Sequence, residues 1–277
     1  DINNIIGNLN IGTSIKISGK IIESPAKGQD IEMQINNCTI LGFVDLESYP
    51  LPKTALTLDY LRQIPNFRVR RPIFLAINRI RSQAVFLTHS FMKYNNFINV
   101  NTPLITASDC EGAGETFTVS TIMKENINNI PNIDGKVDYS KDFFGKKVSL
   151  TVSGQLHAEV LAHGLSDVYT FGPTFRSENS NTSRHLAEFW MLEIESCFMD
   201  LNDLMDFSET YIRYIVNEIV SNNRDDLDLI IRSRKPECDN LLDTLENIRD
   251  NDFVRISYSE VISILDDANN LLESKEF

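Results

Sequence analysis

A polar loop between two apolar segments holds residue types from which a nucleotide site can be built. Residues 168–195 read VYTFGPTFRSENSNTSRHLAEFWMLEIE, with Arg176 and Glu178 before the loop and Phe189 after it. Because strand side chains alternate between faces, Arg176 and Glu178 project together if this segment is a strand. A guanidinium grips phosphate through paired donors, and an aromatic ring stacks on a base. The alternative is a charged pair on a half-exposed hairpin, which contributes little stability. The loop adds a mobile cation and an imidazole suited to outer phosphates, Arg184 and His185.

A second group of polar side chains surrounds a predicted helix start. Residues 147–152 alternate like a strand, and residues 154–165 have helical periodicity. Gln155 and Glu159 are four positions apart, so they share one face of that helix. Ser153 precedes it, where a hydroxyl either caps the helix or contacts a ligand. The alternatives for the other two are a glutamine that binds the helix backbone and a solvated surface acid.

The elements that must position these groups are predicted to mix helices and strands. Residues 11–48 contain three short alternating segments, and the proline-containing stretch 49–72 suits a hinge between domains. Antiparallel hairpins with helices between them favour an α+β fold over a parallel sheet. Further helices are predicted over 73–94, 201–220 and 239–249. Strands are predicted from 97 to Pro103 and over the segment FVRIS. A last helix follows FVRIS, and Ser257 and Glu260 are expected to form a capping box at its start.

Composition excludes several classes of protein. The net charge of −13 opposes nucleic-acid binding by global charge, although Arg62, Arg68, Arg70, Arg71, Arg79 and Arg81 form a local basic stripe. The four cysteines are scattered without a C-x-x-C pair, which argues against a zinc site and a disulfide framework and suits a reducing compartment. No apolar run is long enough for a membrane helix, and the N-terminal residues do not have the pattern of a secretory signal.

Several long motifs resemble one enzyme family. FRSE…SRHLAEF resembles motif 2 of class II aminoacyl-tRNA synthetases, and TFGPTFRSENSNTSRHLAEFWM is similar to the bacterial and organellar asparaginyl-tRNA synthetases in particular. FINVNTPLITASDCEGAGETF resembles motif 1 and the amino-acid loop after it, and GKVDYSKDFFGKKVSLTVSGQLHAE resembles the strand and helix that bear the substrate. The resemblance runs through nearly the whole chain.

The resemblance implies an α+β fold in which helices flank the antiparallel sheet of a class II synthetase. It implies part of an OB-type anticodon-binding barrel over 1–48, a hinge over 49–72, and a catalytic domain over 73–277 with motifs 1 and 2 and a helical insertion from about 200. The early OB strands and motif 3 have no counterpart in this sequence, so the chain is expected to be an interior portion of a synthetase. By itself this portion is expected to be inactive.

The activity implied is ATP-dependent activation of L-asparagine and its transfer to tRNA(Asn), with ATP and Mg²⁺ as cofactors. A homodimer through motif 1 and no membrane association are implied, in the cytoplasm or, for a eukaryotic source, in a mitochondrion or plastid. Arg176 is the implied catalytic residue, because it contacts the α-phosphate and the substrate carboxylate. The implied ATP-binding residues are Arg176, Glu178, Arg184, His185, Leu186 and Phe189. The implied asparagine-binding residues are Glu111, Ser153, Gln155, Glu159 and Arg176, and the Mg²⁺ ligands are expected downstream of this chain.

Two other functions stay open. The first is aspartate or mixed aspartate and asparagine specificity, although aspartyl enzymes have a lysine where this chain has Ala158. A carboxylate from Glu159 accepts a hydrogen bond from an amide and repels a second carboxylate, which favours asparagine. The second is a non-catalytic relative or fragment that binds RNA or a partner. Glu111 also has an alternative role as a solvated loop acid.

Overall fold

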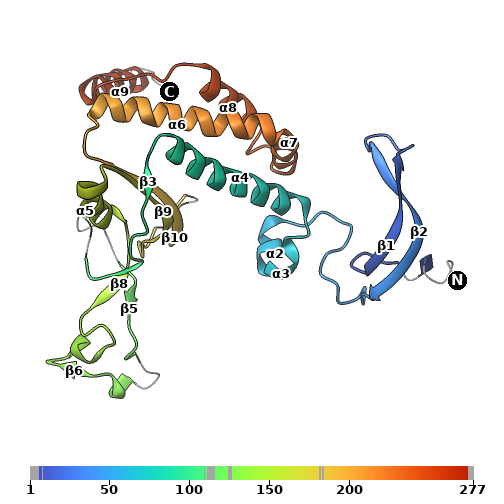
Figure 1. Cartoon of the computed structure of the whole chain (residues 1–277), viewed down its shortest axis with the longest axis horizontal. Helices are drawn as coiled ribbons and strands as arrows, with labels where there is room; N and C mark the ends of the chain where they lie inside the picture. Colours follow the sequence, from blue (N-terminus) through green and yellow to red (C-terminus); the bar gives the residue numbers. More distant parts are fainter. Residues whose placement is uncertain are drawn as a thin grey trace. The chain divides into compact units, whose positions relative to one another are not determined.

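The computed structural model describes residues 6, 7, 9–108, 110, 116–123, 127–180, 182 and 184–273, and for 269–273 only the backbone. The chain forms two compact units, residues 1–79 and 80–277, whose elements are drawn in Figure 1. Helices and mainly antiparallel strands follow one another along the chain, so the predicted α+β class is confirmed.

The first unit begins with a long antiparallel hairpin, β1 (Ser14–Glu23) and β2 (Ile31–Gly42) (Figure 1). The prediction of three short strands was wrong, because the second and third segments form one continuous strand. A register shift explains this: Ser18 pairs with Asn37 and Gly19 with Ile35, so the hairpin absorbs one extra residue as a bulge. A Cβ at Gly19 would lie 2.1 Å from the Gln34 carbonyl oxygen, so the bulge requires glycine.

Three helices follow the hairpin: α2 (Leu58–Gln63), α3 (Pro65–Arg68) and α4 (Pro72–Tyr94). Two arginines of the basic stripe hold the preceding loop. Arg71 Nη2 donates to the carbonyls of Pro52 and Thr54, at 3.0 and 2.9 Å, and Arg70 Nη1 donates to the Tyr49 hydroxyl at 3.2 Å. At least these two cations therefore have a structural role.

The second unit is built on a sheet in the order β10-β9-β3: β3 (Ile98–Asn99), β9 (Asp167–Phe175) and β10 (Glu188–Ser196). The β9–β10 hairpin is antiparallel, as predicted, and β3 runs parallel to β9. Smaller sheets join β4 (Ile105–Thr106), β8 (Val148–Leu150) and β5 (Thr118–Val119), and β6 (Asn132–Ile133) and β7 (Lys136–Val137). Two 3₁₀ turns lie between them, η1 (Ile127–Asn129) and η2 (Tyr139–Lys141).

The two faces of the β9–β10 hairpin have different partners. On one face Tyr169 packs with Phe91, Met92 and Phe97, and residues of α6 surround this cluster. On the other face Val168 packs against α5 (Gln155–Leu165), in a cluster with Val100, Ala158 and Ala162. Alternation therefore sends even-numbered β9 residues toward the α5 side.

The remaining helices are α6 (Leu201–Asn222), α7 (Arg224–Ser233), α8 (Leu241–Asp250) and α9 (Tyr258–Glu273). Ser257 and Glu260 form the predicted capping box, since the Ser257 N–H donates to Glu260 at 2.9 Å and the Glu260 N–H to Ser257 at 3.3 Å. The predicted strand FVRIS was wrong: residues 252–257 have no regular structure, and Val254 is 87% exposed. An alternating pattern needs a partner strand, and the described residues place none beside it.

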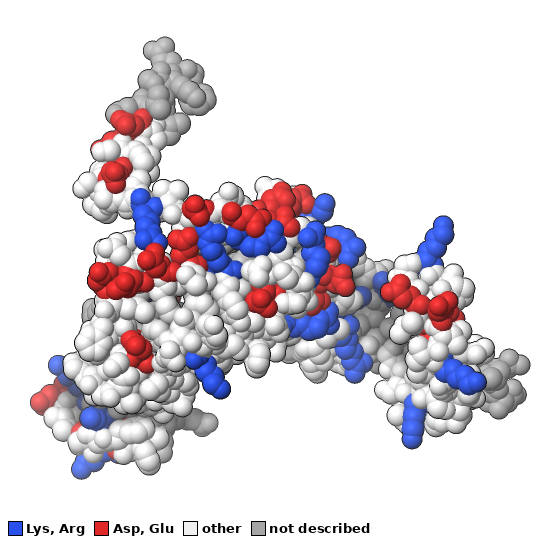
Figure 2. Space-filling view, turned by 45° about the horizontal axis from the view of Figure 1, so that its top comes forward, with Lys and Arg blue, Asp and Glu red and all other residues white. Residues whose placement is uncertain are grey.

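Figure 2 shows acidic and basic side chains intermingled over the helical region. Arg213 illustrates the arrangement: its guanidinium donates to Glu209 at 2.9 Å and to the Arg249 carbonyl at 2.8 Å, which ties α6 to the end of α8. In the part of the chain that the structure describes, no helix combines the length and the hydropathy that a membrane span requires.

Candidate functional site

Arg176 and Phe189 lie together on the α5 side of the hairpin. Phe189 is opposite Thr174 in the register, and the Arg176 guanidinium lies 5.5 Å from the centre of the Phe189 ring. The Arg176 N–H donates to the Ala187 carbonyl at 3.1 Å, which continues the ladder past the end of β9. The backbone thus fixes a cation beside an aromatic ring, an arrangement that the strand alternation left open.

A cavity of about 440 Å³ opens at this point. Its walls include all six residues predicted to bind ATP: Arg176, Glu178, Arg184, His185, Leu186 and Phe189. The structure therefore brings the whole predicted set around one hollow, although the role of each residue stays a prediction. Arg176 Nε is buried and has no hydrogen-bond partner among the described residues, so it is a donor available to a ligand.

His185 is held by two loop hydroxyls. Its Nδ1 lies 3.0 Å from Ser180 Oγ and 2.5 Å from Thr182 Oγ1. Both hydrogen bonds use the same ring nitrogen and leave Nε2 as the nitrogen that can meet a phosphate. The loop thus orients the imidazole before any ligand arrives.

Glu193 is held at the start of α5. It is on the same strand face as Phe189, two alternations further along β10. The Gly154 N–H donates to both Glu193 oxygens, at 3.2 Å to Oε1 and 3.0 Å to Oε2, and the Ser153 hydroxyl donates to Oε1. These donors lie at the N-terminal end of α5, where the helix dipole also favours a negative charge. They form a cradle for the carboxylate.

The hydroxyl of Ser153 makes two hydrogen bonds. It donates its proton to Glu193 and accepts from the Gln155 N–H at 3.1 Å. A lone pair is what remains for a ligand. The N-cap of α5 is Gly154 and no side chain caps this helix, so the predicted capping role of Ser153 was wrong. Ser153 contacts Glu193 instead, and direct contact with asparagine stays a prediction.

Gln155 has a fixed amide orientation. Its Nε2 donates to Glu159 Oε1 at 2.9 Å, and the buried Cys110 thiol donates to its Oε1 at 3.5 Å. A flipped amide would place an oxygen against the Glu159 carboxylate, with no proton between them. The predicted pair on the helix face is therefore in contact, and Cys110 supports it from a different segment.

Three carboxylates, from Glu159, Glu193 and Glu195, share this side of the sheet. Burial raises the pKa of Glu195 above its ordinary value, and the charges of Glu159 and Glu193 raise it further. Negative charge is thus already unfavourable here. A ligand that brings an N–H donor is favoured over one that brings a further carboxylate.

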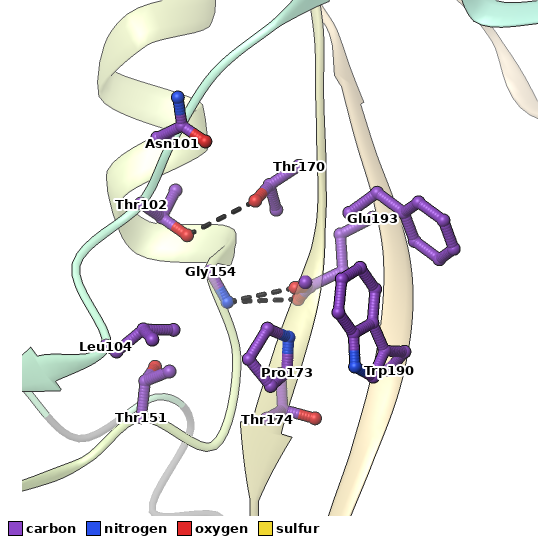
Figure 3. A pocket seen from close by; sticks show the side chains of 12 residues that line it. Asn101, Thr102, Leu104, Thr151, Gly154, Thr170, Pro173, Thr174, Trp190 and Glu193 are labelled. Atoms are coloured by element: carbon purple, nitrogen blue, oxygen red, sulfur yellow. Dashed lines mark hydrogen bonds between the residues drawn. The ribbon is translucent and has the colours of Figure 1, made fainter. Parts of the chain in front are cut away.

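A second cavity, of about 370 Å³, reaches this cradle (Figure 3). Its walls include Gly154 and Glu193, the facing Thr102 and Thr170, and the ring of Trp190. Thr174 lines this cavity and Arg176, two residues later, lines the first one. The two hollows are therefore neighbours along one hairpin.

Sequence reasoning missed Glu193 and Gly154. Alternation placed Glu193 on the same face of the returning strand as Phe189, but the contact of Glu193 with the start of α5 depends on tertiary structure. Glu111 lies outside the described residues, so its predicted contact with the substrate ammonium is not addressed. Within the described residues, no three His, Cys, Asp or Glu side chains group to hold a metal ion.

Comparisons with known proteins identify the family of the chain. The family model for tRNA synthetases class II (D, K and N) matches residues 60–274. The chain is 46% identical over 269 residues to the asparagine–tRNA ligase of Protochlamydia amoebophila, and 46% identical over 267 residues to that of Photobacterium profundum. These alignments cover 97% and 96% of this chain but 56% of each relative. The chain thus spans little more than half the length of the curated relatives it matches.

Solved structures show the same fold. The asparaginyl-tRNA synthetase from Pyrococcus horikoshii complexed with asparaginyl-adenylate superposes with a TM-score of 0.77 at 24% identity, covering 96% of this chain and 54% of that one. A putative aspartyl-tRNA synthetase from Leishmania major superposes with a TM-score of 0.63 at 19% identity, covering 84% and 44%. At these sequence identities, the structural similarity supports a shared fold and nothing more.

Proposed function

The chain belongs to the class II tRNA synthetases (D, K and N), and from this membership we propose that the full-length protein activates L-asparagine with ATP and transfers it to tRNA(Asn). The curated relatives carry the name asparagine–tRNA ligase. The observation that carries the proposal is one strand face that bears the Arg176–Phe189 cavity at one end and the cradled Glu193 at the other. That face therefore offers a site for the nucleotide and, next to it, a site for the side chain of the amino-acid substrate.

The first reaction needs orientation and charge stabilisation and no protein nucleophile. An oxygen of the asparagine α-carboxylate forms a bond to the α-phosphorus of ATP. The bond from that phosphorus to the bridging oxygen breaks, and pyrophosphate leaves with the electron pair. Arg176 stabilises the charge on the α-phosphate, and Phe189 stacks on the adenine and holds the nucleotide in line. In the second reaction a terminal ribose hydroxyl of tRNA attacks the acyl carbon, and AMP leaves.

Asparagine is selected by the carboxylates next to this site. Glu193 lies on the strand face of Arg176 and lines the neighbouring cavity, whereas Glu159 is not among the residues that line it. We therefore propose that Glu193 accepts from the substrate amide, while Glu159 orients the amide of Gln155. An aspartate side chain would add a fourth carboxylate to a group in which burial and like charge already raise the pKa of Glu195. Aspartate is disfavoured for that reason.

Mg²⁺ and the partners complete the proposal. ATP is used as its Mg²⁺ salt, and no step is assigned to side chains that hold the ion, because the described residues present no such group. A homodimer forms through motif 1 and the helix that precedes it, α4, which exposes apolar side chains, among them Phe86, which is 68% exposed. The relatives named above come from bacteria, so we place the reaction in the cytoplasm.

The test is ATP–pyrophosphate exchange by the full-length protein with each amino acid in turn. Asparagine should support exchange, and exchange with aspartate should be weaker by roughly a hundredfold or more, because a site that accepts a hydrogen bond from an amide penalises a carboxylate. Exchange that depends on aspartate would move the assignment to the sister specificity. An absence of exchange with every amino acid would favour a non-catalytic relative.

A further inference from the structure

Gly154 occupies a position where space, and not backbone conformation, requires glycine. Its φ of −85° and ψ of −7° are ordinary right-handed helical values that any residue adopts. A Cβ added there would nevertheless lie 2.6 Å from Thr102 Oγ1, 2.8 Å from Thr170 Cγ2 and 3.3 Å from Glu193 Oε2. The first two distances are shorter than side chains tolerate, so a larger residue would force a displacement.

The surroundings of Gly154 offer little room for that displacement. Thr170 is a buried residue of β9, and its hydroxyl lies 3.3 Å from the Thr102 hydroxyl (Figure 3). These two threonines pack against the backbone of Gly154 from the side of the cavity. The Gly154 N–H meanwhile points at the Glu193 carboxylate, as the two dashed lines in Figure 3 show. Packing and hydrogen bonding thus fix the same peptide group.

The two oxygens of Glu193 differ in what they have left to offer. Oε1 accepts from both the Ser153 hydroxyl and the Gly154 N–H, which uses the two acceptor sites of a carboxylate oxygen. Oε2 accepts from the Gly154 N–H alone, so one acceptor site remains on it. Oε2 is also the Glu193 atom that a Cβ at position 154 would crowd.

We propose that Gly154 is a positioning residue for amino-acid choice: the lack of a Cβ lets its N–H fix Glu193 so that Oε2 receives the substrate amide. The inference rests on the proposed function, in which Glu193 accepts from asparagine. Thr102 and Thr170 contribute to this positioning, because their packing sets the position of the Gly154 peptide. Specificity thus depends on three residues that act through the position of the Glu193 carboxylate.

Gly154→Ala in the full-length protein tests the proposal by ATP–pyrophosphate exchange. The added methyl should displace the carboxylate, raise KM for asparagine, and lower the asparagine-to-aspartate ratio of kcat/KM roughly tenfold or more, as expected when a charge-assisted hydrogen bond is lost. KM for ATP should change less than about twofold, because the nucleotide cavity does not include Gly154. The matched control is Gly164→Ala in the same helix, where a Cβ meets nothing within 4 Å.

Relief of the clash gives a sharper result. Combining Gly154→Ala with Thr102→Ala and Thr170→Ser removes the two closest contacts of the new methyl, and it should restore much of the lost ratio. If Gly154→Ala fails to fold, Ser153→Ala removes one donor from Glu193 without adding an atom, and it should lower the ratio severalfold. An unchanged asparagine-to-aspartate ratio of kcat/KM in either variant, or equal increases in KM for asparagine and for ATP, would overturn the inference. Asparagine-dependent exchange by the wild type would still support the proposed function in that case. A wild type without asparagine-dependent exchange would overturn both.

Discussion

Replacing Arg176 by alanine separates a catalytic role from a structural one, because the two roles predict effects of different size. In the folded protein its guanidinium lies over the Phe189 ring at 5.5 Å. A cation–π contact at such a site contributes about 0.5–1 kcal/mol. Arg176 Nε is buried without a hydrogen-bond partner among the described residues, a situation that costs roughly 1–3 kcal/mol. The two contributions oppose each other, so Arg176→Ala should leave the free energy of unfolding unchanged or raise it by up to about 2.5 kcal/mol.

The catalytic consequence is much larger. A preorganised donor to charge that develops in the transition state contributes about 2.7–4 kcal/mol, which is roughly a hundredfold to thousandfold in rate. Arg176→Ala should therefore reduce exchange by that factor. Arg176→Lys keeps the charge but loses the planar pair of donors, so it should recover only part of the activity.

The measurement combines pyrophosphate exchange with urea unfolding of the same full-length variants. Arg249→Ala is the matched control, because it makes the same change at an arginine of α8 that pairs with Asp250 outside both cavities. It should leave exchange unchanged. Exchange by Arg176→Ala within about fivefold of wild type, together with a loss of stability above about 1 kcal/mol, would refute the reasoning and leave Arg176 as part of a cross-strand contact.

Three further outcomes are expected. Burial, together with the charges of two nearby glutamates, raises the pKa of Glu195, so the folded state keeps a proton that the unfolded state releases. Stability should therefore fall as pH rises from the ordinary carboxyl pKa through the raised value, and Glu195→Gln should remove that decline in urea unfolding at several pH values. Cys110→Ala should raise KM for asparagine roughly threefold or more, whereas Cys110→Ser should not, because serine still donates to Gln155. Cys238→Ala is the control. Equal effects of the two Cys110 variants on KM would contradict the proposal that the Cys110 thiol supports Gln155. Phe86→Asp should convert a dimer into a monomer in analytical ultracentrifugation, and a wild type that is already monomeric at micromolar concentration would contradict the motif 1 interface.

The local elements around the site could be predicted from the sequence because their signals are local. Helix α5 follows from its periodicity, and the hairpin follows from alternation on both sides of a polar loop. Alternation placed Arg176 with Glu178 and Phe189 with Glu193, but whether the faces of the two strands coincide depends on the register between the strands, and the structure puts Arg176 and Phe189 in contact. The period of a strand is two, so the face of each side chain follows as soon as the strand is identified.

The contacts that connect segments could not be predicted in the same way. Glu193 is unremarkable in the sequence, and its role depends on the Gly154 N–H, which comes from a helix about forty positions earlier. Gly154 itself has ordinary helical dihedral angles, so its need for glycine depends on Thr102 and Thr170. The prediction of a strand at FVRIS was wrong because a local pattern was not enough. The segment alternates like a strand, but the described residues place no strand beside it to complete the hydrogen bonds.

Position 158 connects this packing to the choice of amino acid. Ala158 is fully buried in the cluster with Val168, which lies opposite Glu195 across the hairpin. A lysine there would overpack the cluster at a cost of about 1–3 kcal/mol, but its stem points along the side that carries the carboxylates. Ala158→Lys should therefore narrow the asparagine-to-aspartate ratio of kcat/KM, since its ammonium offsets the repulsion of a substrate carboxylate. Ala162→Lys overpacks the same cluster one turn further from the start of α5, so it should lower stability by a similar amount and leave the ratio unchanged. If both variants shift the ratio equally, the effect comes from disturbed packing, and charge at position 158 does not set specificity.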